Sequence, residues 1–199
     1  MPIRTREDYR FYLEADRASL AMTRSRPRLF GDEIWRFERL LRAIEYCGCH
    51  PDSLIWKARK SLLMLRFHLL STRLGFTIPP NVFGPGLAIA HRGTIVVNGA
   101  ARVGANCRLH VCVNIGTRAG TDDQVPVIGD NVYIGPGAML FGPIRIADGI
   151  AIGANSVVNK SFEEPNITVA GAPARKISDR GSEGLLIQGT EAAGRRRER

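Results

Sequence analysis

The sequence predicts an α+β protein in which N-terminal α-helices precede a parallel β-helix. Residues 1–75 carry apolar side chains at the three- and four-residue spacings of amphipathic helices, and later in the chain aliphatic residues recur at every sixth position. A six-residue period is neither helical nor the two-residue alternation of an ordinary strand, and it is typical of β-helix repeats. We therefore divide the chain into a helical region at 1–75, a β-helix at 76–178 and a basic tail at 179–199 that we expect to be disordered.

Three helices are expected in the N-terminal region. The first spans approximately Arg6–Leu20, and the second begins after Gly31, where two acidic residues suit a helix N-terminus. The third begins near Pro51-Asp52-Ser53, where a side chain can cap free N–H groups, and it ends before Gly75. Three leucines line one face of this third helix: Leu62, Leu65 and Leu69.

In the repeat, an aliphatic residue leads each unit of six. Each unit supplies one short strand and one corner, and three units complete a coil whose lead residues stack inside. The polar segment 118–126 interrupts the period and must leave the coil as a loop, which is a common position for a binding face in repeat proteins. The predicted inward lead residues are Val97, Val103, Leu109, Ile115, Ile128, Ile134, Leu140, Ile146, Ile152 and Val158.

The net charge of +9 is concentrated in the helical region. Such a basic region could attract an anionic substrate, a membrane surface or a nucleic acid, but no nucleic-acid motif accompanies it, so a solvated basic face is the default interpretation. No apolar run is long enough to span a bilayer, and the cysteine spacing is poor for zinc. We therefore expect a soluble, cytoplasmic protein with no membrane span, no bound nucleic acid and no metal.

The order of these parts resembles the serine acetyltransferases. The repeat begins with His91-Arg-Gly-Thr-Ile-Val-Val and ends with Gly171-Ala-Pro-Ala-Arg, and the likeness covers roughly residues 30–178. It is greatest to a short branch of that family often found among genes for surface polysaccharides. The resemblance implies a left-handed β-helix, a homotrimer, acetyl-CoA as the donor co-substrate, and a site in the groove between neighbouring subunits.

His91 is the predicted catalytic residue because it matches the general base of that family. Imidazole titrates near pH ~6.5, so its neutral form can take a hydroxyl proton during attack on a thioester. The repeat agrees, because Ile89 leads its unit and His91 then sits at an outward corner. His110 lies about one coil away, and we expect His110 and Asn114 to contact the acceptor. The structural alternatives are an exposed or coil-capping His91 and a plain outward His110.

The resemblance also implies a set of coenzyme A contacts, most of them through backbone groups. Two cations near the end of the repeat lie where CoA phosphates could be bound. The predicted cofactor-binding residues are Gly116, Thr117, Gly135, Ala154, Arg175 and Lys176.

The sequence departs from the family at four positions. Family members place carboxylates upstream of the catalytic histidine and directly before it, where this chain has Phe76 and Ala90. They also use an Arg-His pair in the loop to hold the serine carboxylate, where this chain has Gln124 and Val125. We infer that the reaction is retained and that a sugar-type hydroxyl is slightly favoured over L-serine as acceptor. The chain lacks the Ile end by which the family docks cysteine synthase, so that partner is not expected.

Two other functions fit parts of the sequence. The missing carboxylates suit a catalytically inactive trimeric scaffold or an acyl-CoA-binding protein. A zinc hydratase on the same fold needs three convergent histidines, whereas the repeat contains only His91 and His110. The acetyltransferase interpretation is therefore preferred.

Overall fold

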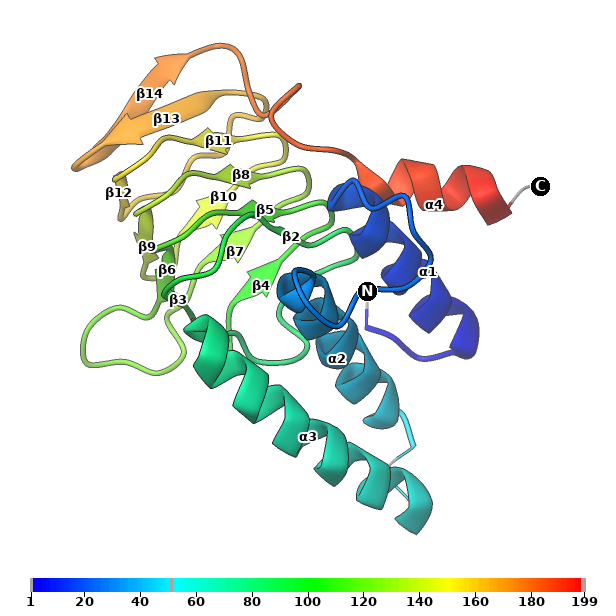
Figure 1. Cartoon of the computed structure of the whole chain (residues 1–199). Helices are drawn as coiled ribbons and strands as arrows, with labels where there is room; N and C mark the ends of the chain where they lie inside the picture. Colours follow the sequence, from blue (N-terminus) through cyan, green and yellow to red (C-terminus); the bar gives the residue numbers. More distant parts are fainter. Residues whose placement is uncertain (1, 51, 198–199) are drawn as a thin grey trace.

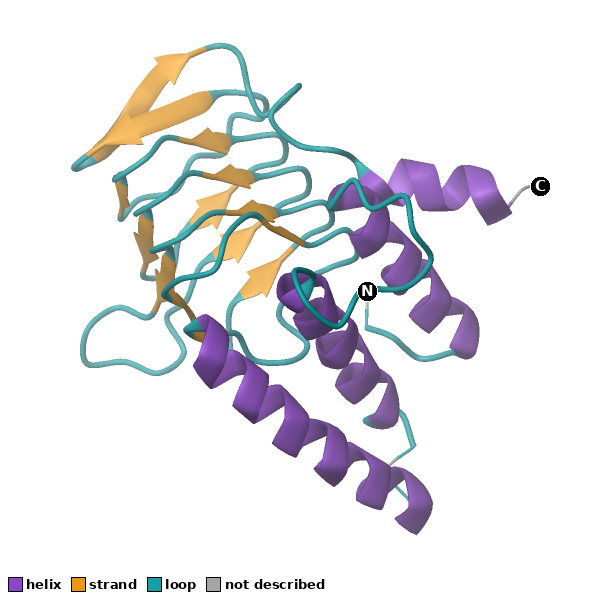
Figure 2. Cartoon of the chain, viewed as in Figure 1, coloured by secondary structure: helices purple, strands orange, loops and turns teal. Residues whose placement is uncertain are grey.

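The computed structural model describes residues 2–50 and 52–197, so Pro51 and the last two residues of the predicted tail lie outside the described part. Helices lie on one side of the molecule and a stack of short strands on the other (Figures 1 and 2). None of the described helices has the length and hydropathy needed to cross a membrane. The helices are α1 (Arg6–Ser19), α2 (Glu33–Cys47), α3 (Leu54–Leu74) and α4 (Gly189–Arg197).

The strands form three sheets in which every pair but one is parallel. From β2 to β12 every third strand returns to the same sheet, so the chain passes around a common core. Sheet A has the order β1-β3-β6-β9-β12, sheet B β10-β7-β4, and sheet C β14-β13-β11-β8-β5-β2, with β13 and β14 antiparallel. The strands are β1 (Phe76–Thr77), β2 (Ala88–Ile89), β3 (Ile95–Val97), β4 (Arg102–Val103), β5 (Arg108–Leu109), β6 (Asn114–Gly116), β7 (Val127–Ile128), β8 (Tyr133–Ile134), β9 (Met139–Phe141), β10 (Arg145–Ile146), β11 (Ala151–Ile152), β12 (Val157–Val158), β13 (Thr168–Gly171) and β14 (Ala174–Ser178).

The six-residue period identifies the core of these sheets. Every predicted lead residue is buried, and none is more than 5% exposed. The register explains why, because Leu109 pairs with Ile134 and Ile134 with Ile152, which stacks equivalent positions from coil to coil. The segment 118–126 forms the predicted loop between β6 and β7.

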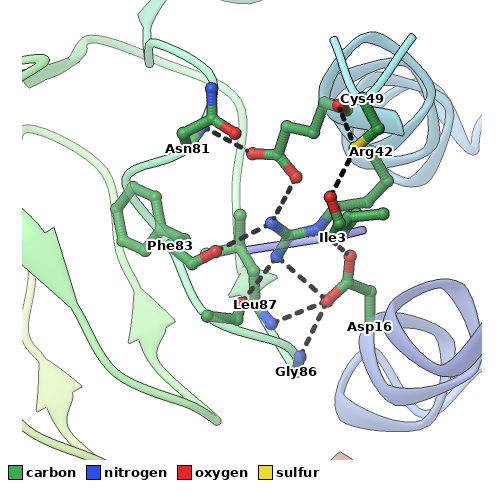
Figure 3. A network of polar contacts seen from close by, with 10 residues as sticks. Ile3, Asp16, Arg42, Cys49, Asn81, Phe83, Gly86 and Leu87 are labelled. Atoms are coloured by element: carbon green, nitrogen blue, oxygen red, sulfur yellow. Dashed lines mark hydrogen bonds and ion pairs between the residues drawn. The ribbon is translucent and has the colours of Figure 1, made fainter. Parts of the chain in front are cut away.

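Side chains from α1 and α2 cover the open edge of the first coil (Figure 3). Strands at this edge have backbone groups with no neighbouring strand, and such groups are costly to bury unpaired. Arg42 of α2 is fully buried and donates to the carbonyl oxygens of Phe83 at 2.8 Å and Gly84 at 2.7 Å. Asp16 of α1 accepts from the backbone N–H groups of Gly86 and Leu87 at 2.8 and 3.0 Å.

Two further carboxyl groups complete this polar plug, which we define as Asp16, Glu38, Arg42 and Glu45. Glu45 accepts from the N–H of Asn81 at 2.7 Å, and Glu38 accepts from the N–H of Ile89 at 3.1 Å. Arg42 also pairs with Asp16 at 2.8 Å and with Glu45 at 3.0 Å. The plug therefore satisfies the edge of the β-stack with side chains in place of another strand.

Replacing Glu38 with Gln should make the protein less sensitive to rising pH. Burial, reinforced by the charge of Asp16, raises the pKa of Glu38 well above its ordinary value. The folded state therefore holds a proton that the unfolded state releases, so stability is lost as pH rises from the ordinary glutamate pKa towards the raised one. Gln has no such proton and keeps an oxygen for the N–H of Ile89.

We expect the free energy of unfolding of E38Q, relative to wild type, to increase with pH. Urea unfolding monitored across the pH range measures it, with E183Q as the matched control because Glu183 is exposed. A constant difference between E38Q and wild type across that range would contradict a raised pKa at Glu38.

The C-terminal segment differs from the predicted disordered tail, because the structure contains α4 packed against α1. Ser19 donates to the carbonyl oxygen of Ile187 at 3.2 Å, and Asn106 Nδ2 donates to Thr190 Oγ1 at 2.8 Å. A Cβ at Gly189 would collide with the carbonyl oxygen of Ala15, so glycine permits this close approach. The polar, Arg-rich composition of this segment is typical of disorder. The tertiary contacts that hold it against α1 cannot be read from composition.

Candidate active site

Two histidines lie together at one corner of the β-stack. His91 follows β2 and is exposed, and His110 follows β5 and is half-buried. Their ring centroids are 5.9 Å apart, and the ring planes are tilted by 56°. Pairing of Ile89 with Leu109 places the two on adjacent coils, as the six-residue period predicts.

Tyr133 adds a third ring that sequence reasoning missed. Its ring centroid is 5.0 Å from that of His110, on the coil beyond it. No motif marks Tyr133, because an outward aromatic residue in a repeat unit is unremarkable until the register places it beside a histidine. The register does so through the pairing of Arg108 with Tyr133.

The surroundings of His110 favour its neutral form. Burial lowers its pKa, and the nearby charges of Arg108 and His91 lower it further. Among the described residues, the buried Nε2 atom of His110 has no hydrogen-bond partner. A neutral imidazole with a free ring nitrogen can bind a hydroxyl or a carbonyl group.

The coils of sheet C are closely stacked beyond His110. The N–H of His110 donates to Ile134 at 3.2 Å, and the N–H of Gly135 donates to Ile152 at 2.9 Å, so successive coils are in register. A Cβ at Gly135 would lie 2.9 Å from the backbone nitrogen of Ala154, closer than side chains are found. Glycine at this position, which is itself buried, thus lets the coils stack, and Ala154 on the next coil is exposed. Gly135 and Ala154 are adjacent, as two contacts of one ligand must be.

The two predicted cations lie at the far end of the same sheet. Arg175 and Lys176 are on β14, five strand spacings from β2 in the order of sheet C, or roughly 24 Å. Lys176 Nζ pairs with Asp179 and Glu164, each at 2.6 Å, and these hydrogen bonds raise its pKa. Arg175 is exposed and forms no ion pair with any described residue. Arg175 is therefore the better anion-binding residue of the two.

Within one chain, three other predicted contacts do not lie along sheet C. They are Asn114, Gly116 and Thr117. Asn114 and Gly116 belong to β6 of sheet A, across the corner from His110, and Thr117 follows them. The Oδ1 atom of Asn114 would lie 2.9 Å from a Cβ at Gly116, so its side chain borders the backbone of that residue.

The departures from the family pattern persist in three dimensions. Phe76 is 4% exposed and points into the core, so it cannot stand in for a carboxylate beside His91. In the loop, Gln124 Oε1 is buried without a partner among the described residues, and Val125 packs against the core. Neither loop position offers a cation. The described residues also contain no group of three or more His, Cys, Asp or Glu side chains placed to hold a metal ion.

The chain is similar over most of its length to known serine acetyltransferases. It is 34% identical over 149 residues to that of Mycobacterium tuberculosis, which covers 68% of this chain and 64% of the relative. It is 34% identical over 148 residues to that of Staphylococcus xylosus, which covers 68% of this chain and 67% of the relative. The chain belongs to the serine acetyltransferase family. No family model matches it.

Solved structures of the family resemble the whole fold. Serine acetyltransferase of Brucella abortus in complex with coenzyme A has a TM-score of 0.65 at 28% identity, covering 88% of this chain and 68% of that one. The Neisseria gonorrhoeae serine acetyltransferase in complex with serine has a TM-score of 0.65 at 26% identity, covering 87% of this chain and 70% of that one. The present chain spans less than two thirds of the length of the Mycobacterium tuberculosis relative.

Proposed function

We propose that this protein transfers an acetyl group from acetyl-CoA to a hydroxyl group, as a homotrimer of left-handed β-helices with its sites between subunits. The observation that carries the proposal is the pairing of His91 with His110 on adjacent coils, in a chain of the serine acetyltransferase family. The three parallel sheets around one core support the β-helix.

His91 acts as the general base. It takes the proton of the acceptor hydroxyl while that oxygen attacks the thioester carbonyl carbon. Backbone N–H groups near Gly116 stabilise the resulting oxyanion. When the carbon–sulfur bond breaks, His91 returns its proton to the departing thiolate, so the ester and the free thiol form with the histidine restored. His110 holds the acceptor, because its neutral ring keeps a nitrogen free for a hydrogen bond.

Coenzyme A lies along the edge of sheet C in this proposal. The exposed Ala154, stacked closely on Gly135, lets an extended chain approach the backbone of this coil, and Arg175 meets the phosphates. Gly116 and Thr117 contribute from sheet A, where the groove is completed by a neighbouring subunit. Lys176 has a smaller role because its charge is already neutralised.

L-Serine is the first candidate acceptor. The relatives are named for serine, and a neighbouring structure holds serine. A sugar-type hydroxyl is the second, favoured by the loss of the loop cation at Gln124 and of the carboxylate at Ala90. At both places a zwitterionic amino acid would find no side chain of opposite charge, and unpaired charges are costly to desolvate.

An acceptor panel tests both the activity and its substrate. We expect thiol release from acetyl-CoA to depend on an added hydroxyl compound, with kcat/KM for L-serine at least about tenfold above that for nucleotide sugars, the low end of the discrimination that binding contacts provide between substrates. The reverse order would assign a sugar acceptor. If no acceptor stimulates release and calorimetry detects no acetyl-CoA binding, the protein is a scaffold and the proposal is wrong.

A further inference from the structure

Helix α3 exposes a continuous apolar stripe. Leu62, Leu65 and Leu69 were predicted to share one face, and that face is turned to solvent, with the three side chains 53–62% exposed. Ile55, seven residues before Leu62, lies about two turns further along the same side and is 80% exposed. Their spacing of seven, three and four residues keeps them on one side of a helix. Only Phe67 and Leu74 of α3 are buried, so the helix attaches by its other side.

The same helix is strongly basic. It contains no acidic residue, and its exposed cations are Lys57, Arg59, Lys60, Arg66 and Arg73.

A groove of about 610 Å³ lies between α2 and α3. Its apolar floor includes Leu40, Leu69 and Leu70, and four arginines line it. Arg39, Arg66 and Arg73 form no ion pair with any described residue. The lining arginines are Arg36, Arg39, Arg66 and Arg73.

The segment between α1 and α2 repeats this chemistry beside the groove. Pro27 lines the groove together with Leu69 and Arg73 of α3, which places the segment next to the end of that helix. Arg28, Leu29 and Phe30 follow directly; the Arg28 side chain is 65% exposed, and Leu29 and Phe30 are 67% and 76% exposed. Two separate parts of the chain thus present apolar side chains and cations together.

We propose that this surface docks onto a bilayer that contains anionic lipids. The α3 face, defined as Leu62, Leu65 and Leu69 with Arg66 and Arg73, lies in the plane of the interface. There the leucines enter the boundary of the acyl chains, and the arginine stems pass between them to reach lipid phosphates. The proposal concerns where the enzyme works and is independent of the acetyl-transfer chemistry.

Charge disfavours one alternative occupant, the same α3 face of a second copy of the chain. A symmetric contact between two α3 faces would bring rows of arginine together with no acidic residue on either helix, and like charges at a desolvated contact repel. An anionic lipid surface supplies the opposite charge over the whole face.

Co-sedimentation of the protein with vesicles tests the proposal. We expect binding to vesicles of phosphatidylcholine mixed with phosphatidylglycerol and weak or no binding to phosphatidylcholine alone, with affinity falling as salt is added. The double variant L65S/L69S should lower the partition coefficient at least about tenfold, because two leucines no longer leave water. R66Q/R73Q should lower it about fivefold for each cation removed.

The controls are L185S and R145Q, which change an exposed leucine and an exposed arginine away from α3, and both should bind vesicles as wild type does. Thermal unfolding and sedimentation velocity of every variant check its fold and its oligomeric state. The proposal is wrong if anionic and neutral vesicles bind the protein equally or not at all. It is also wrong if L65S/L69S alters the oligomeric state, which would make this face a contact between copies.

Discussion

Replacing His91 with Ala should lower kcat/KM for acetyl transfer by about 10²- to 10⁴-fold, the usual contribution of a general base. The imidazole at residue 91 is exposed at the corner of the β-stack, with His110 on the next coil. His110 cannot replace it, because burial and neighbouring positive charge lower its pKa and make it a weaker base. We expect the loss to appear mainly in kcat, since His91 takes part in the chemical step.

The matched control is H68A. His68 is also exposed, but it lies on α3, away from the corner, and its removal should leave kcat/KM unchanged. Calorimetry should show that H91A binds coenzyme A as wild type does. Acetyl transfer by H91A within about twofold of wild type would exclude His91 as the base and would direct attention to His110.

Replacing Arg42 with Ala should cost about 3–5 kcal/mol of stability, the range for breaking a buried ion pair by removing one partner. Asp16 and Glu45 would remain buried without their cation. The carbonyl oxygens of Phe83 and Gly84 would lose their donor as well. The loss comes from stranded polar groups and not from apolar area, so refilling the space with Met should not restore it.

An exposed ion pair provides the comparison. Removing Lys176, which pairs with Glu164 and Asp179 at the surface, should change stability far less than R42A does, because solvent screens exposed ion pairs. Urea unfolding of R42A, R42M and K176A at one pH measures the three effects. If R42A costs no more than K176A, the polar plug does not contribute to stability as its geometry indicates.

Much of the β-stack was predictable because the six-residue repeat identifies its core residues directly. A lead residue at every sixth position is buried wherever the period holds, from Val97 to Val158. The same frame placed His110 near His91, since they follow Leu109 and Ile89, which are paired in register on successive coils.

The polar plug and α4 were not predictable in the same way. Both depend on contacts between segments far apart in the chain, such as Arg42 with Phe83 and Asn106 with Thr190. No local period encodes such pairs. Tyr133 was missed for a related reason, because its importance arises from the ring that lies above it and not from its neighbours in sequence.

His91 was predicted as the base through a motif, whereas the choice between the two candidate cations needed the structure. Sequence alone treats Arg175 and Lys176 alike. Only the positions of Glu164 and Asp179 show that one of the two charges is already compensated.

Sheet C is closed at its two ends by different structures, and this fixes the number of its strands. Helical side chains seal the end at β2, whereas an antiparallel hairpin with charged residues, β13 and β14, finishes sheet C at the other. Within the described residues, sheet C presents a bare parallel strand at neither end, so growth of a fibre by adding parallel strands to this sheet is blocked at both. For the same reason, the length of sheet C along which an elongated ligand can lie is fixed.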